Sequence, residues 1–315
     1  MESSEQHDSD AATAPDQPGP PSRWRLLFLR ADGVRAGWRL ILFGLFFFVA
    51  LQLLFLAALA LRLPVPTSHT VLTPATGTTQ EGVSILATFV AVLLMARIER
   101  RSVFDYGLPL RGAFGGRFWT GIVWGLAAFS VTILLIAALH GFSLGHVVLS
   151  GRALIRQSLL WAVVFVLVGI WEESFFRGYA LITLADGIGF WPAASVLSAF
   201  FCFTHLVGNA GEAWAGMPQI FLISMLFCLT LRRTGNLWFA VGMHAGWDYA
   251  ETYLFSAPDS GTVSPGTLVS SSFHGPRWLT GGQIGPEASV FADVVLLAAM
   301  LLFAQLYPPR EEAAK

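Results

Sequence analysis

The chain has 315 residues, of which 55% are hydrophobic and only 12% are charged, whereas a soluble domain carries about 25% charged residues. This composition excludes an ordinary soluble enzyme and predicts a polytopic membrane protein. The formal net charge of −1 argues against nucleic acid as a partner, because nucleic-acid binding depends on neutralising phosphates with a basic surface.

Four regions follow from the changes in composition along the chain. Residues 1–22 are polar and without apolar periodicity, and we expect a disordered tail. Residues 23–39 mix arginine with large apolar side chains and are expected to form a basic juxtamembrane segment. We assign residues 40–307 to one transmembrane helical domain and residues 308–315 to a short C-terminal tail.

Long apolar runs recur within the transmembrane domain at lengths near the ~20 residues that a helix needs to cross a bilayer. They lie at Leu40–Leu61, Val83–Ala96, Phe118–Leu139, Ser158–Ala185, Phe190–Val207, Met217–Leu231, Leu237–Phe255 and Ala288–Leu306. Val83–Ala96 is the weakest of them, because its apolar core is short. The predicted fold class is therefore all-α, a membrane helix bundle with about eight transmembrane helices.

The basic residues predict the orientation of this bundle, because cytoplasmic loops carry an excess of Lys and Arg. In the eight-helix arrangement, 14 basic residues fall on one side, four fall on the other, and Arg177 lies within a span. We therefore expect both termini to be cytoplasmic. The longest loop on the opposite side, Ser256–Pro286, is rich in Ser and Gly.

Ionisable residues interrupt the run Ser158–Ala185. Glu172, Glu173 and Arg177 lie within it, and ionisable groups inside a span usually mark a functional site because their burial is costly. Glu173 and Arg177 are four residues apart and can pair on one helix face, which leaves Glu172 on another face for chemistry. The alternative is a buried ion pair that only fixes helix packing.

Two later runs add further polar side chains. His205 ends the motif Phe201-x-x-x-His205, and His244 precedes Asp248 by four residues, so that Asp248 is expected to orient the His244 imidazole. Glu251 is expected to be solvated at the outer interface, and Cys202 is expected to be a small buried hydrophobe rather than a nucleophile.

The depths of these residues in the membrane constrain how far the helix of Ser158–Ala185 extends. The glutamates and the histidines lie at compatible depths only if the helix of Ser158–Ala185 continues past Arg177, or if the following helix starts inside the membrane.

The three motifs together resemble a known family. Their order and placement on successive transmembrane regions are similar to those of the CAAX-protease and bacteriocin-processing (Abi, or CPBP) family, which includes the type II CAAX prenyl endopeptidases; the motifs are Glu172-Glu173-x-x-x-Arg177, Phe201-x-x-x-His205 and His244-x-x-x-Asp248. The resemblance covers residues 158–255.

The resemblance implies an intramembrane endopeptidase that cleaves a membrane-bound or lipidated peptide with a glutamate-activated water. Glu172 would be the general base, His205 would help to hold the water and His244 would stabilise the oxyanion, with Asp248 beside it. Arg177 would pair with Glu173.

No cofactor is expected for this chemistry. Two histidines and two glutamates also fit a zinc site, but the chain has no His-Glu-x-x-His motif and Arg177 would compete for Glu173. Metal-independent chemistry is therefore favoured.

Two other functions remain open from the sequence. The first is a catalytically silent scaffold or an immunity or regulatory protein of the same family. The second is an ion or proton transporter, which would need a continuous polar path, although the remaining runs offer almost no ionisable lining. In each case we expect a multi-pass protein of the cell membrane, here the bacterial plasma membrane, whose partners are the lipid bilayer and a membrane-associated peptide or protein.

Overall fold

The computed structural model describes residues 28–30, 33–67, 70–208 and 213–309, and most of them are helical. The predicted tail at 1–22 lies outside the described residues, as do the first residues of the basic segment and the last of the C-terminal tail.

The elements of the first half are β1 (Leu29–Arg30), β2 (Gly33–Val34), α2 (Ala36–Ala60), α3 (Pro74–Glu99), η1 (Val103–Tyr106), α4 (Gly116–Ala138), β3 (Phe142–Val147) and α5 (Gly151–Glu172). Those of the second half are η2 (Glu173–Ala180), α6 (Leu181–Ile188), α7 (Phe190–Gly208), η3 (Ala213–Gly216), α8 (Met217–Thr234), α9 (Trp238–Asp248), η4 (Tyr249–Leu254), β4 (Val269–Phe273), α10 (Arg277–Thr280), η5 (Pro286–Ala288) and α11 (Val290–Leu306).

Each of the eight predicted apolar runs coincides with a helical segment of this structure, apart from one or two residues at the ends of four of them. Within the described residues, six helices are long and apolar enough to cross a membrane, which makes the protein a multi-pass membrane protein. Val290–Leu306 is apolar but shorter, and the helix that starts at Trp238 does not meet the same criteria. The count of eight spans and the cytoplasmic termini therefore stay predictions.

The second helix is longer than its sequence pattern indicated. Thr73 caps its start by accepting a hydrogen bond from the backbone N–H of Thr76, and Pro74 occupies the first helical position, where its missing N–H costs nothing. The helix then runs for 26 residues to Glu99. The polar residues before Val83 are thus helical, and the expectation of a weak span at this place is wrong.

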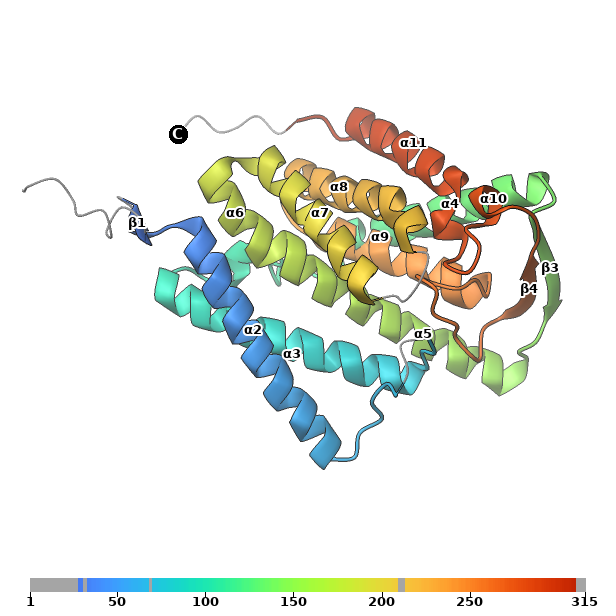
Figure 1. Ribbon diagram of the computed structural model, residues 1–315, viewed down its shortest axis with the longest axis horizontal. Coiled ribbons are helices and arrows are strands. Elements are labelled where there is room, and N and C mark those ends of the chain that lie inside the picture. Colours follow the sequence, from blue (N-terminus) through green and yellow to red (C-terminus); the bar gives the residue numbers. More distant parts are fainter. Residues whose placement is uncertain (1–27, 31–32, 68–69, 209–212, 310–315) are drawn as a thin grey trace, which may run out of the picture.

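The central helix continues past Arg177, as the depths of the polar residues demanded. Helical backbone is continuous from Gly151 to Ile188 over 38 residues, and Figure 1 shows this long rod crossing the molecule from α5 to α6. Its middle part, η2, is π-helical. Glu172 and Glu173 therefore lie within the rod and not at its end.

Glycines allow α4 and α9 to lie in backbone contact. A Cβ on Gly121 would stand 2.2 Å from the carbonyl oxygen of Phe239, and one on Gly242 would stand 2.1 Å from that of Phe118. Gly125 and Gly246 make equally close approaches one turn further along each helix. Small residues at membrane-helix contacts permit such packing, and here they fix the helix that carries His244.

A cluster of charged and phenolic side chains joins the ends of three helices. Arg39 of α2 pairs with Glu99 of α3 and, at 3.2 Å, with Asp186 of α6. Arg101 reaches the same Asp186 carboxylate at 3.4 Å. Arg39 and Arg101 thus lie at one end of the bundle, in agreement with the grouping of basic residues found in the sequence.

The described chain is mostly helical, as predicted, and two short strands add to it at the opposite end. β3 pairs antiparallel with β4, with Phe142 opposite Phe273; β4 lies within the predicted loop Ser256–Pro286, and β3 lies between two of the predicted apolar runs. Val71 also forms an isolated bridge with Val263. The strands escaped prediction because the pairing joins segments more than 100 residues apart, each too short for a clear alternation.

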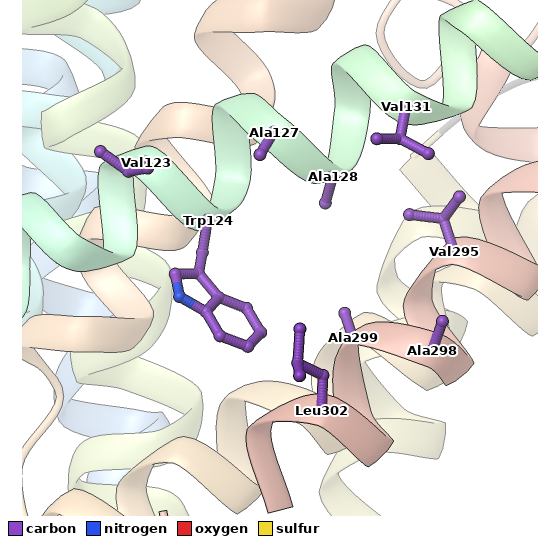
Figure 2. A pocket seen from close by; sticks show the side chains of 9 residues that line it. All are labelled: Val123, Trp124, Ala127, Ala128, Val131, Val295, Ala298, Ala299 and Leu302. Atoms are coloured by element: carbon purple, nitrogen blue, oxygen red, sulfur yellow. The ribbon is translucent and has the colours of Figure 1, made fainter. Parts of the chain in front are cut away.

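An open apolar groove lies between α4 and α11 (Figure 2). Its volume is about 360 Å³, and the side chains that line it are Val123, Trp124, Ala127, Ala128, Val131, Val295, Ala298, Ala299 and Leu302. This lining has no titratable group, so the chemistry of the described residues must lie elsewhere.

Candidate active site

Five of the six predicted site residues lie on two helices that are in contact, the continuous helix of α5 and η2 and the helix α9, whereas His205 lies on α7. Gly169 of α5 makes this possible, because a Cβ there would stand 2.8 Å from the carbonyl oxygen of Val241 in α9. Both helices also change from α to π at their motifs, at Glu173 in η2 and at Tyr249 in η4. π-Helical turns are rare and occur frequently at functional sites.

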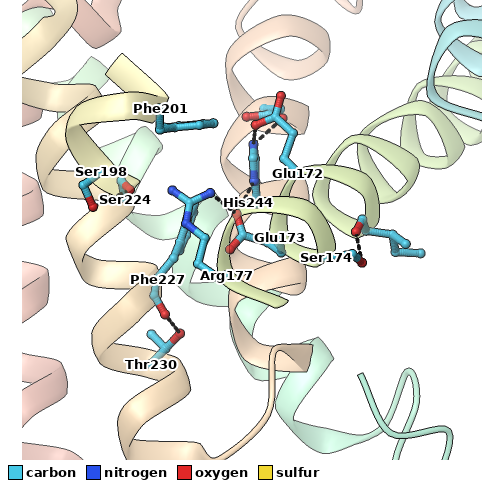
Figure 3. A network of polar contacts seen from close by, with 12 residues as sticks. Glu172, Glu173, Ser174, Arg177, Ser198, Phe201, Ser224, Phe227, Thr230 and His244 are labelled. Atoms are coloured by element: carbon cyan, nitrogen blue, oxygen red, sulfur yellow. Dashed lines mark hydrogen bonds and ion pairs between the residues drawn. The ribbon is translucent and has the colours of Figure 1, made fainter. Parts of the chain in front are cut away.

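Glu173 is the centre of the polar network shown in Figure 3. Its Oε1 accepts a hydrogen bond from Nη1 of Arg177 at 3.0 Å and lies 3.0 Å from Nδ1 of His244. An ionised carboxylate only accepts hydrogen bonds, so Nδ1 of His244 is the donor. Glu173 is fully buried. The pair that spacing indicated is present, and it also holds the imidazole.

The other ring nitrogen of His244 faces two carboxylates. Nε2 lies 3.7 Å from Oε2 of Glu172 and 3.5 Å from Oδ2 of Asp248, both longer than a good hydrogen bond. We expected Asp248 to orient the ring, but the shorter contact comes from Glu173. The side chains of Glu172 and Asp248 are 14% and 12% exposed, so Glu172 is the accessible glutamate of the pair.

Aromatic rings enclose the charged centre. The Arg177 guanidinium lies over Phe201 at 4.4 Å and over Phe227 at 5.5 Å from the ring centroids. Phe227 in turn stacks on His244 with the centroids 5.2 Å apart. These rings exclude water from the Glu173–Arg177 pair and add cation–π attraction.

His205 approaches this network only through Phe201. Its Nδ1 lies 2.9 Å from the carbonyl oxygen of Phe201, and its ring packs edge-on against the Phe201 ring, with centroids 4.4 Å apart. Among the described contacts, none joins His205 to Glu172 or His244. The structure thus brings five of the six predicted residues into direct contact and leaves His205 one ring away.

Sequence reasoning missed Glu81. This residue of α3 is 4% exposed, accepts a hydrogen bond from Gln80 on Oε1 and has no partner for Oε2. It interacts electrostatically with Glu172 and His244. The apolar run predicted from the sequence begins at Val83, which leaves Glu81 outside it, although a lone acid between Gly77 and Val83 is a usable signal.

The expectation that Glu251 is solvated is wrong. The side chain is fully buried, and its Oε2 accepts a hydrogen bond from the Trp247 indole at 3.0 Å. Asp259 and Glu287 of the following loop converge on it. Depth along the helix places Glu251 near the interface, but the segment with Asp259 and Glu287 folds back over it, which spacing along one helix does not indicate.

The two remaining candidates from the sequence are the Cys202 thiol and a zinc site. Cys202 is half-buried and its thiol lies 3.6 Å from the Met217 carbonyl oxygen. Among the described residues, the side chains that converge in the manner of metal ligands are Glu251, Asp259 and Glu287, a group that includes neither histidine of the motifs. Zinc at Glu172 and the histidines thus finds no preformed ligand set in the described part of the chain.

Comparison with known proteins gives one match. Residues 154–250, about a third of the chain, match the family model described as type II CAAX prenyl endopeptidase Rce1-like. This range contains the three motifs and the whole network around Glu173. No curated protein and no solved structure was found to match the chain. This family match agrees with the resemblance that the three motifs indicated: the region 154–250 is similar to the type II CAAX prenyl endopeptidases.

Proposed function

We propose that the protein is an intramembrane endopeptidase that hydrolyses a peptide bond of a membrane-bound or lipidated substrate with a water activated by Glu172. The observation that carries the proposal is the pairing of an accessible carboxylate, Glu172, with the His244 imidazole inside an apolar bundle. The family match, whose description names an endopeptidase, supports the same class of reaction.

In the proposed reaction, Glu172 removes a proton from water as the oxygen attacks the carbonyl carbon of the substrate. The negative charge that develops on the carbonyl oxygen is stabilised by Nε2–H of protonated His244, since Nδ1 is held by Glu173. The tetrahedral intermediate then collapses, the C–N bond breaks and Glu172 delivers its proton to the leaving amine. Bonds and protons balance without a further reactant.

The remaining motif residues have positioning roles in this proposal. Arg177 fixes Glu173, and Glu173 fixes His244. An ionised Asp248 cannot donate to an oxyanion, so it would support the charge of His244 instead. His205 would help to hold the water, which requires that substrate binding bring its ring closer to Glu172 than the Phe201 contact allows.

The test compares the wild type with Glu172→Gln. Peptides that appear in membranes only with the wild-type protein identify the substrate, and a synthetic version of that substrate is then cleaved in proteoliposomes. Because loss of a general base typically costs 10²–10⁴-fold, we expect kcat/KM to fall by about that factor. Asp105→Asn, an exposed carboxylate of η1, is the matched control and should cleave normally.

Two results would contradict the proposal. Normal cleavage by Glu172→Gln would remove the base assignment. The scaffold alternative would be favoured instead if the wild type cleaves nothing and a Glu172→Gln, His205→Ala double variant still regulates a membrane partner. Inhibition by 1,10-phenanthroline, which chelates zinc but not calcium, would replace metal-independent chemistry with zinc chemistry.

A further inference from the structure

Three carboxylates converge beside the catalytic network but outside it. Glu251 belongs to η4, Asp259 to the loop after it, and Glu287 to η5 just before α11. One oxygen from each lies within 4.8 Å of the others. Glu251 and Glu287 are buried and Asp259 is half-buried. Three segments of the chain therefore meet through groups of the same charge.

Glu251 offers an oxygen that the protein does not use. Its Oε2 accepts a hydrogen bond from Trp247, whereas Oε1 is buried and has no hydrogen-bond partner among the residues that the structure describes. This oxygen faces the loop that carries Glu287, because a Cβ on Gly285 would stand 3.5 Å from it. Leaving a buried carboxylate oxygen unpartnered is costly, so this atom indicates a ligand between Glu251 and the loop.

The hydrogen bonds to Glu287 support the same conclusion. The Ser260 N–H and hydroxyl both donate to Oε1 of Glu287 at 2.8 Å, which favours its ionised form. The cluster therefore combines donors that hold a carboxylate charged with neighbours that repel that charge.

We propose that Glu251, Asp259 and Glu287 form a binding site for a divalent cation, Ca²⁺, which fastens the loop between η4 and α11 to the helix that carries Asp248. The inference is independent of the proposed proteolysis, since none of the three residues has a role in that reaction.

The ligand chemistry determines the choice of ion. All three ligands are carboxylate oxygens, which suit hard cations such as Ca²⁺ and Mg²⁺ and not soft metals. Ca²⁺ binds oxygens at about 2.3–2.6 Å, so opposite ligands of its shell lie about 4.6–5.2 Å apart. The three oxygens lie within 4.8 Å of one another, so they can share one such shell. Mg²⁺ demands near-ideal octahedral geometry and is usually bound through one or two carboxylates and several waters, whereas Ca²⁺ accepts several carboxylates in an irregular arrangement.

The first experiment measures thermal unfolding of the full-length protein in detergent, after treatment with a chelator and with Ca²⁺ added back. Ligand binding to the folded state raises Tm, and we expect a rise of about 5 °C or more at saturating Ca²⁺. Asp259→Asn and Glu287→Gln should lose this rise, whereas Asp105→Asn should retain it. Using two single variants guards against the misfolding of either one.

The second experiment uses Tb³⁺ as a luminescent substitute for Ca²⁺. The Trp247 indole is hydrogen-bonded to Glu251 and should sensitise Tb³⁺ emission, which Ca²⁺ should displace. Trp247→Phe should lose most of that emission while retaining a Ca²⁺-dependent rise in Tm. No rise with Ca²⁺, or a rise that persists in both Asp259→Asn and Glu287→Gln, would overturn the site. An equal rise with Mg²⁺ would overturn its assignment to Ca²⁺.

Discussion

The protein buries two groups of carboxylates, and the two groups are balanced in different ways. Around Glu173 the opposite charges belong to the chain itself, since Arg177 and His244 share one carboxylate oxygen. Around Glu251 the nearest acids are Asp259 and Glu287. Each group leaves one buried carboxylate oxygen without a hydrogen-bond partner among the described residues, Oε2 of Glu173 and Oε1 of Glu251, but only the first group pairs its central carboxylate with an arginine.

The difference separates positioning from binding. A buried acid with a fixed cation can orient a catalytic side chain, because its geometry does not depend on solution conditions. A buried acid without one depends on protons or on an added ion, and so responds to what the solution supplies. Glu172, the proposed base, belongs to the first group through its contact with His244.

Replacing Arg177 removes the permanent positive charge from the group around Glu173 and makes it more like the group around Glu251. Arg177→Met removes the arginine from the buried Glu173 and leaves His244 as its partner, and breaking a buried ion pair typically costs about 3–5 kcal/mol. We expect that loss in the free energy of unfolding, measured by reversible unfolding in mixed micelles. Adding Glu173→Gln in the same chain should recover most of it, since neutral replacement of a whole buried pair is often tolerated. A loss below about 1 kcal/mol would show that Arg177 does not balance the group.

A smaller effect tests how Glu251 is held. Trp247→Phe removes the indole donor to its carboxylate, and a hydrogen bond to a charged group contributes about 1.5–3 kcal/mol. Trp161→Phe is the matched control, because Trp161 is fully buried but its indole nitrogen has no partner. We expect Trp247→Phe to lower the free energy of unfolding by about that amount more than the control does. Equal losses would mean that packing, and not the hydrogen bond, is what the indole provides.

The smallest effect is expected at the surface. Arg101 and Asp186 pair at 3.4 Å with side chains 42% and 41% exposed, and exposed pairs contribute about 0–1 kcal/mol. Arg101→Ala should therefore change the free energy of unfolding by less than about 0.5 kcal/mol in the same assay. A loss comparable with that of Arg177→Met would show that exposure to solvent does not weaken the Arg101–Asp186 pair relative to the buried Arg177–Glu173 pair.

Much of the fold could be predicted because membrane helices have a strong one-dimensional signal. Each apolar run was located, and the continuation of the central helix past Arg177 followed from comparing depths. The polar start of α3 was missed, since the capping box at Thr73 lies outside the apolar pattern. Pairing of β3 with β4 depends on contacts distant in sequence, which periodicity does not report.

Prediction of the site succeeded for residues of one helix, such as Glu173 and Arg177, because their spacing along the helix determines whether their side chains touch. It failed where contact depends on how helices are arranged, as with Glu81 on α3 and with the folding back of Asp259 and Glu287 over Glu251. It also gave Asp248 the orienting role that the structure gives to Glu173, because the contact of Glu173 with His244 joins two helices and leaves no trace in spacing.

The glycine contact between α4 and α9 limits which substitutions the sequence can accept during evolution. At Gly121 and Gly242 even the single carbon of alanine would collide with backbone of the facing helix, so almost any codon change there would separate the helix that carries His244 from its support. Lipid-facing positions such as Val123 and Leu301 are exposed and can exchange one apolar residue for another. During evolution the exposed apolar positions should therefore change first, while the glycine contact between α4 and α9 stays nearly unchanged.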